Sequence, residues 1–153
     1  MALRNIVKDG DSVLRKKCRE VTAFDDRLHI LLDDMKETLD YANGAGLAAP
    51  QVGILKRVAL VSVDEDFFEL INPEIIATEG EQTDPEGCLS IPGVCGTVSR
   101  PYKVTVKAQD RWGDEFIAMG EGLLARAFCH ELDHLDGILF KDKVIEYYDL
   151  DED

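Results

Sequence analysis

"GLLARAFCHELDHLDG" (residues 122–137) holds two of the three histidines of this chain, four residues apart, with a glutamate beside the first. In a helix of 3.6 residues per turn, His134 lies about 40° and Glu131 about 100° from His130. The apolar residues Leu123, Leu124 and Ala127 fall on the same side. The stretch therefore predicts a helix whose buried face carries two imidazoles and a carboxylate.

Polar groups on a buried face are costly unless something satisfies them. A lone histidine there is most simply a core side chain hydrogen-bonded to the backbone. Two histidines spaced i and i+4 around a glutamate instead indicate a divalent-metal site, with the glutamate as a base. Cys129 lies about 100° from His130 on the helix, so it is poorly placed as a third ligand and is expected on the flank.

A catalytic divalent site usually has three protein ligands and one open position. Downstream of the histidines, Glu146 and the acidic residues of the tail are candidates, but no pattern marks them. Upstream, Cys88 lies within "DPEGCLSIPG" (residues 84–93), framed by glycine and proline. A thiolate from this segment could complete a set of one cysteine and two histidines. These residues leave both alternatives open.

Length and composition place the chain among globular proteins. Its 153 residues, 45% of them hydrophobic and 31% charged, predict one catalytic domain over residues 1–153. The net charge of −14 disfavours nucleic-acid binding. Neither a secretory signal nor a long apolar segment is evident, so a cytoplasmic protein without membrane attachment is expected. The four cysteines are expected to be thiols or metal ligands.

Hydrophobic periodicity predicts a second helix over residues 24–44 and strands over residues 57–63, 67–76, 103–110 and 111–120, the last two as a hairpin. Residues 79–101 show little periodicity and are interpreted as a long functional loop. The predicted fold class is α+β, with antiparallel strands packed around a central metal-binding HExxH helix, plus an N-terminal helix.

Three motifs then define a resemblance. "GAGLAAPQ" (residues 44–51), "EGCLS" (residues 86–90) and "HELDH" (residues 130–134) occur in this order. They match GxGxAAxQ, EGCLS and HExDH, the signature motifs of the peptide deformylases, without a missing position. The chain thus resembles that family over nearly its whole length. One departure is Cys129, where many members carry glutamine; it is not expected to change the mechanism.

The resemblance implies a hydrolase that removes the formyl group from the N-terminal formylmethionine of nascent polypeptides and releases formate. Its metal is Fe²⁺, which Zn²⁺, Ni²⁺ or Co²⁺ can replace. The implied ligands are Cys88, His130 and His134. Glu131 would transfer protons, and the Gln51 amide and the Leu89 backbone N–H would stabilise the oxyanion.

The resemblance also implies a substrate site. The Gly46 backbone would lie beside the substrate main chain, and the methionine pocket would involve Ala45, Gly87, Arg126 and Ala127. A simpler interpretation makes Gly44 and Gly46 a helix C-cap and a turn, and both interpretations can hold. Arg100 is the implied partner of Glu86; the alternative is an ordinary surface pair.

The implied partners are N-formylmethionyl nascent polypeptides, with contact to the ribosome left open, and the expected state is a monomer. Two other functions compete with this one. An HExxH zinc endopeptidase would take its third ligand from downstream, so Cys88 would be dispensable for metal binding. A metal-holding protein without activity would normally lack Glu131 or Gln51, and both are present.

Overall fold

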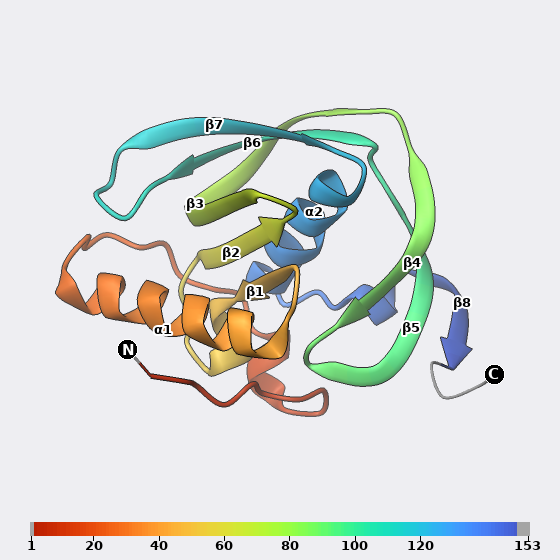
Figure 1. The fold of residues 1–153 in the computed structure, drawn as a ribbon, viewed down its shortest axis with the longest axis horizontal. Coiled ribbons are helices and arrows are strands. Elements are labelled where there is room, and N and C mark those ends of the chain that lie inside the picture. The colour runs from red at the N-terminus through yellow and green to blue at the C-terminus, as the bar shows by residue number, and fades with distance from the viewer. Residues whose placement is uncertain (1, 150–153) are drawn as a thin grey trace.

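The computed structural model describes residues 2–149 and has two layers of antiparallel strands around one helix (Figure 1). The α-helices are α1 (Asp26–Ala42) and α2 (Leu123–Leu135). Short 3₁₀ turns are η1 (Ser12–Arg15), η2 (Ala49–Val52) and η3 (Phe140–Asp142). The predicted α+β class is therefore confirmed. Within the described range neither helix is long and apolar enough to span a membrane.

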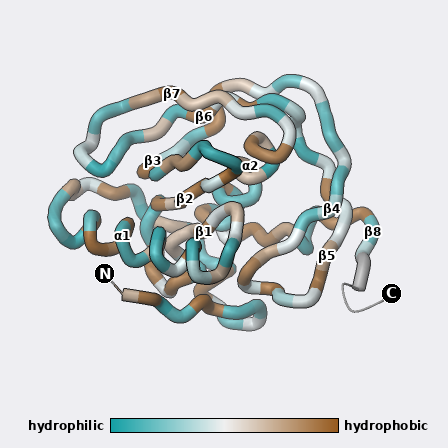
Figure 2. Tube along the Cα trace, in the orientation of Figure 1, coloured by the Kyte–Doolittle hydropathy of each residue, from teal (hydrophilic) through white to brown (hydrophobic). Residues whose placement is uncertain are grey.

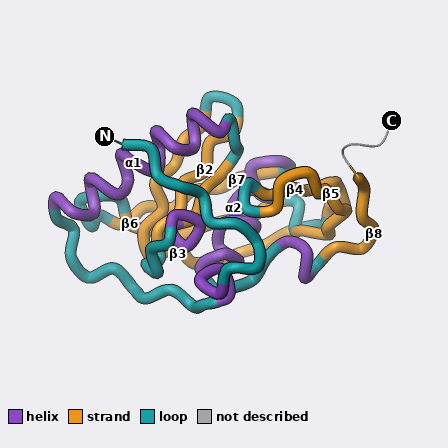
Figure 3. The backbone as a smooth tube through the Cα atoms, turned by 90° about the horizontal axis from the view of Figure 1, so that it is seen from below, coloured by secondary structure: helices purple, strands orange, loops and turns teal. Residues whose placement is uncertain are grey.

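The larger sheet has five strands in the order β1-β2-β3-β6-β7, and every neighbouring pair is antiparallel. Its strands are β1 (Gly46–Ala48), β2 (Val58–Val63), β3 (Asp66–Glu79), β6 (Lys103–Gln109) and β7 (Glu115–Glu121). The smaller sheet, in the order β4-β5-β8, contains β4 (Gln82–Cys88), β5 (Ile91–Arg100) and β8 (Val144–Asp149). These three strands gather at one end of the molecule (Figure 3).

Helix α1 forms where its apolar spacing predicts it. Asp25 caps the N-terminus by accepting a hydrogen bond from the Leu28 backbone N–H, and Asn43 ends the helix in the left-handed conformation at φ 55°. Its buried side chains pack against β1 and β2: Leu28, Leu31, Leu32, Met35 and Leu39. The C-cap is thus Asn43 and not Gly44.

Helix α2 is buried on nearly every side because it contacts strands of both sheets: β1, β2, β6 and β7 on one side and β5 on the other. Hydrophobic residues concentrate on α2 and the strands beside it, while the outer loops are mostly hydrophilic (Figure 2). Cys129 lies off the face that carries the histidines, as expected, and it packs in the core with Phe128 and Leu132. A helical wheel cannot show that a second layer covers the other face.

The strand predictions have two outcomes. The hairpin of β6 and β7 is confirmed, and β3 bends at Asn72, where the pairing register shifts and φ is 51°. The interpretation of residues 79–101 as a long loop is wrong, because they form the β4–β5 hairpin. That hairpin was missed because most β4 side chains are exposed and its glycines and prolines hide the alternation.

Candidate metal centre

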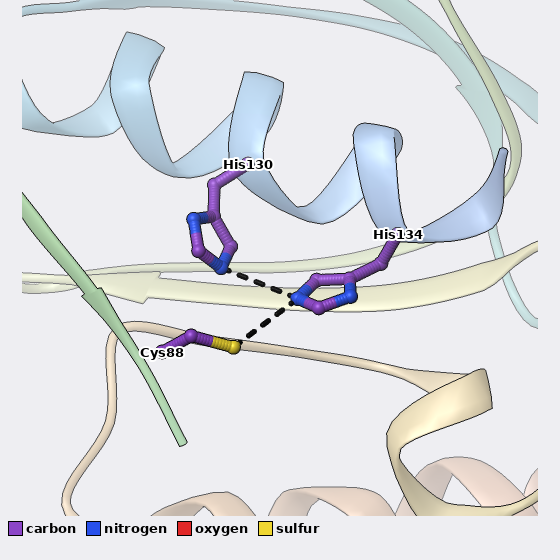
Figure 4. A group of neighbouring side chains, drawn as sticks. All are labelled: Cys88, His130 and His134. Carbon is purple, nitrogen blue, oxygen red and sulfur yellow. Dashed lines mark hydrogen bonds between the residues drawn. The ribbon is translucent and has the colours of Figure 1, made fainter. Parts of the chain in front are cut away.

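The thiol of Cys88 and the imidazoles of His130 and His134 converge on one point (Figure 4). Cys88 ends β4, whereas the histidines project from successive turns of α2. His134 Nε2 lies 3.4 Å from Cys88 Sγ and 3.2 Å from His130 Nε2. All three donor atoms lie within 4.8 Å of one another. One sulfur and two imidazole nitrogens at this spacing form a donor set suited to Zn²⁺ or Fe²⁺.

The orientation of His130 also fits a metal ligand. Its Nδ1 lies 2.5 Å from Glu86 Oε1, so Nδ1–H donates to the carboxylate and Nε2 faces Cys88 and His134. A carboxylate behind a histidine is the usual outer partner of a metal ligand. His134 Nδ1 is buried without a hydrogen-bond partner among residues 2–149. The residues present therefore fit a bound divalent cation.

Glu86 is held by two arginines. Arg100 donates through Nη2 at 2.6 Å and Nε at 3.2 Å, and Arg126 donates through Nη1 at 2.7 Å. Burial acts to raise the pKa of Glu86, but the hydrogen bonds from His130 and Arg100 hold it well below its usual range. Arg100 also donates to Asp133 at 2.6 Å. The predicted Arg100–Glu86 pair is confirmed, and it is buried and not a surface pair.

Glu131 lies beside the ligand cluster without joining it. Its Oε2 is 4.0 Å from His130 Nε2, and its Oε1 is buried without a hydrogen-bond partner in the described part of the chain. Burial raises the pKa of Glu131 to about 7, although the positive charge of His130 acts to lower it. A carboxylate in this environment is suited to accept and release a proton near neutral pH.

The two histidines differ in their electrostatic surroundings. Burial lowers the pKa of His134 well below its usual value, and the charge of His130 adds to this effect. For His130, burial acts in the same direction but is outweighed by Glu131, Cys88 and Glu86, which raise its pKa to about 10. These three groups thus favour a positive charge at His130, and they would favour a bound cation in the same way.

Gln51 has a fixed orientation. Its Oε1 accepts a hydrogen bond from the Ala48 backbone N–H at 2.9 Å, so its Nε2 faces the site. Nε2 donates to Ser90 Oγ at 3.1 Å and lies 3.5 Å from Cys88 Sγ. Ser90 was missed by the sequence analysis, although it is the last residue of the EGCLS motif. The Gln51 side chain thus connects GAGLAAPQ with EGCLS, two motifs that are distant in sequence.

A pocket of about 330 Å³ opens beside these groups. Every predicted site residue except His134 lines it: Ala45, Gly46, Gln51, Gly87, Cys88, Leu89, Arg126, Ala127, His130 and Glu131. His134 is fully buried behind them. The remaining wall is mainly apolar and includes Ile91, Pro92, Val94 and Leu123. The first three were missed because their segment was interpreted as a loop; the helical wheel places Leu123 on this face.

Of the downstream candidates for a third ligand, Glu146 does not join the cluster. Glu146 is exposed on β8, and the acidic residues 151–153 lie outside the described residues. Cys129 is also separate from it, with a pKa that burial raises to about 11. Among residues 2–149, Cys88 is the sulfur donor that meets both histidines.

Comparisons with known proteins agree with this geometry. Residues 3–148 match the family model described as polypeptide deformylase. The peptide deformylase of Caldicellulosiruptor bescii is 60% identical over 152 residues, which cover 99% of this chain and 92% of the relative. That of Acetivibrio thermocellus is 59% identical, covering 99% of this chain and 89% of the relative.

Solved structures show the same fold. A peptide deformylase from Legionella pneumophila has a TM-score of 0.90 at 44% identity, covering 93% of this chain and 86% of that one. The enzyme from Thermotoga maritima has a TM-score of 0.91 at 39% identity, covering 93% and 97%. Sequence and structure therefore agree, and this chain belongs to the peptide deformylase family.

Proposed function

We propose that this chain removes the N-formyl group from the N-terminal formylmethionine of nascent polypeptides and releases formate. The observation that carries the proposal is the meeting of the Cys88 thiol with His130 and His134 beside Glu131 and the Gln51 amide. This arrangement joins all three signature motifs at one pocket. Membership of the deformylase family supports the same activity.

Cys88, His130 and His134 are the proposed ligands of a divalent cation. Fe²⁺ is the proposed ion because resemblance to the family implies it, and the sulfur and imidazole donors would also accept Zn²⁺, Ni²⁺ or Co²⁺. When bound, such an ion supplies a Lewis acid and lowers the pKa of water from about 15.7 towards about 7. Glu86 contributes by keeping the His130 ring in its present orientation.

Glu131 is the proposed proton carrier. Its unpartnered Oε1 is available to take a proton from the attacking water and to pass it to the departing amine. As the formyl carbon is attacked, negative charge develops on the formyl oxygen. The Gln51 Nε2–H and the Leu89 backbone N–H are the proposed donors to that oxygen, and losing one such donor typically costs about 2.7–4 kcal/mol of barrier.

The pocket is the proposed site of the methionine side chain. Ala45, Gly87 and Ala127 are small, so they leave room for an unbranched thioether. Arg126 contributes the stem of its side chain, because its guanidinium is already paired with Glu86. The Gly46 backbone, at the free edge of β1, is the proposed partner of the substrate main chain.

The zinc endopeptidase interpretation lacks the support that it needs. It required a third ligand downstream of the histidines, whereas the sulfur that meets them belongs to Cys88, upstream. We further propose that residues 1–153 act as one catalytic domain, in the cytoplasm, as a monomer on nascent chains. The negative net charge argues against direct nucleic-acid binding.

The test is formate release from a formyl-Met peptide by the full chain, loaded with iron without oxygen. The wild type should release formate, and Glu131→Ala should be slower by about 10²–10⁴-fold, the usual contribution of a proton-transferring group. Internal cleavage of an unformylated peptide is measured in parallel. No formate from the wild type, or internal cleavage by it, would contradict the proposal.

A further inference from the structure

The carboxylate of Glu131 is not held by hydrogen bonds to its Oε1. That atom is buried and unpartnered within residues 2–149, and Oε2 makes only a 4.0 Å ionic contact with His130 Nε2. By contrast, Gln51 is fixed by hydrogen bonds at both ends of its amide. Among residues 2–149, packing and not hydrogen bonding therefore determines where the Glu131 carboxylate lies.

Gly46 is the backbone that the carboxylate packs against. A Cβ added to Gly46 would lie 2.7 Å from both Cδ and Cγ of Glu131, and closer still to Oε2. Carbon atoms in favourable contact are about 3.5–4.0 Å apart, so even a methyl group would overlap the carboxylate. Gly46 does not have a positive φ, so its conformation does not explain why a glycine is there.

Neither element can move aside easily. Gly46 pairs with Val61 of β2, and the next two residues, Leu47 and Ala48, are fully buried. On the other side, α2 is buried between the sheets, and His130 is tied to Glu86. A side chain at position 46 would therefore displace the Glu131 side chain, because among the described residues no hydrogen bond to Oε1 holds it in place.

We propose that Gly46 is a positioning residue: the absence of a side chain there determines where the Glu131 carboxylate lies beside the histidines. The proposal adds a second role to a residue whose backbone is assigned to the substrate, and its kinetic part rests on the proposed function. It also gives the second glycine of GAGLAAPQ a physical reason, which neither a turn nor a C-cap supplies.

The kinetic test compares Gly46→Ala with the wild type, both nickel-loaded and with bound metal measured. Displacement of Glu131 should lower kcat per metal-loaded molecule by about 10²-fold, while KM for the formyl-Met peptide stays within about twofold. If the new methyl group only hindered the substrate, KM would rise and kcat would be kept. A kcat within about twofold of the wild type would overturn the proposal.

A thermal cycle tests the contact without measuring formate. The melting temperatures of wild type, Gly46→Ala, Glu131→Ala and the double variant are compared, all nickel-loaded. Gly46→Ala should lower Tm by roughly 3–9 °C when Glu131 is present and leave it unchanged in Glu131→Ala. An equal loss in both backgrounds would contradict the proposal. If Gly46→Ala does not fold, a double variant as stable as Glu131→Ala supports the proposal, and one that also fails refutes it.

Gly96→Ala is the matched control. A Cβ there would also collide, 2.6 Å from Val144 Cγ1, but this contact lies between β5 and β8. It should lower Tm equally with and without Glu131 and leave kcat unchanged. If Gly96→Ala lowers kcat as Gly46→Ala does, crowding in general is the cause and the proposal fails. If the wild type releases no formate, the proposed function fails. The thermal cycle would still show whether a side chain at position 46 collides with Glu131.

Discussion

Two carboxylates of this chain are almost equally buried but are partnered differently. Asp34 on α1 is 6% exposed, and Glu86 beneath the candidate metal centre is 7% exposed. Asp34 accepts hydrogen bonds from the Ala2 backbone N–H at 2.8 Å and from Arg4 Nε at 3.0 Å, and the Arg4 side chain is 30% exposed. Glu86 instead meets two arginines that are 2% and 5% exposed, together with His130.

The difference shows what a buried carboxylate needs for stability alone. The hydrogen-bond donors to Asp34 are one partly exposed arginine and one backbone N–H. Around Glu86 the chain buries two more charged groups, although desolvation largely cancels the gain from a buried ion pair. The Glu86 cluster therefore contributes mainly by fixing the orientation of His130. The following predictions test this contrast between the two regions.

The largest effect is expected for Glu86→Gln, compared with Asp34→Asn. The amide leaves the buried arginines without their shared negative charge, so the free energy of unfolding should fall by about 3–5 kcal/mol. Loss of the carboxylate behind His130 should also weaken metal affinity by about 10–100-fold. Urea unfolding and metal titration measure both effects. Equal metal affinity in Glu86→Gln and Asp34→Asn would remove the contrast.

Arg100→Ala should have the next largest effect. It removes the bidentate partner of Glu86 and one of the two cations that pair with Asp133, so the free energy of unfolding should fall by about 3 kcal/mol. Arg15→Ala is the control, because its pair with Asp142 is exposed and is worth no more than about 1 kcal/mol. Chemical unfolding of both variants makes the comparison; losses of the same size would show that burial of the Glu86 cluster has no special effect.

A smaller, pH-dependent effect is expected for Asp34→Asn. Burial acts to raise the pKa of Asp34, but hydrogen bonds from Ala2 and Arg4 hold it below its ordinary value of 3.8. Its contribution to stability is therefore complete above that value and is lost as the pH falls through the lower, folded-state pKa. The variant should be less stable by about 1–2 kcal/mol at pH 7.

Urea unfolding of wild type and Asp34→Asn at pH 7 and pH 3.5 follows this effect. The gap between the two proteins should narrow at the lower pH, and metal affinity should be unchanged at pH 7. If the difference in free energy of unfolding instead widened at the lower pH, the folded-state pKa of Asp34 would be raised and not lowered. Weaker metal binding by Asp34→Asn would show that the α1 region is not independent of the site.

The smallest effect on activity is expected for Cys129→Ala. Burial raises the pKa of this thiol to about 11, although Arg100 acts to lower it, so it is neutral at pH 7. The variant should release formate within about twofold of the wild type. Alkylation of the folded wild type at pH 7 should leave Cys129 unmodified. A tenfold loss of activity would mean that this thiol takes part in the Glu86 cluster.

Much of the fold could be predicted from local pattern. The spacing of Leu28, Leu31 and Leu32 indicates α1, and the alternation in residues 103–110 indicates β6. The β4–β5 hairpin could not be predicted in this way, because most β4 side chains are exposed and its glycines and prolines hide the alternation; the pairing of β5 with β8 also depends on contacts distant in sequence. The buried position of Cys129 also depends on a second layer that covers the helix.

The candidate site was predicted more completely than the fold, since its residues lie in three recognisable motifs. What the motifs could not show is which atoms support them. Arg126 pairs with Glu86, and Ser90 orients Gln51, through contacts across 40 and 39 residues of sequence. The steric role of Gly46 is similarly invisible without the position of Glu131.

In the proposed mechanism Cys88 holds the cation while Glu131 moves the proton. The most direct measurement is bound metal per chain in Cys88→Ala, with Glu131→Ala prepared in parallel. Glu131→Ala should keep about one metal ion per chain but lose formate release, whereas Cys88→Ala should lose both. A Cys88→Ala protein that retains its metal as well as Glu131→Ala does would show that Cys88 is not a ligand.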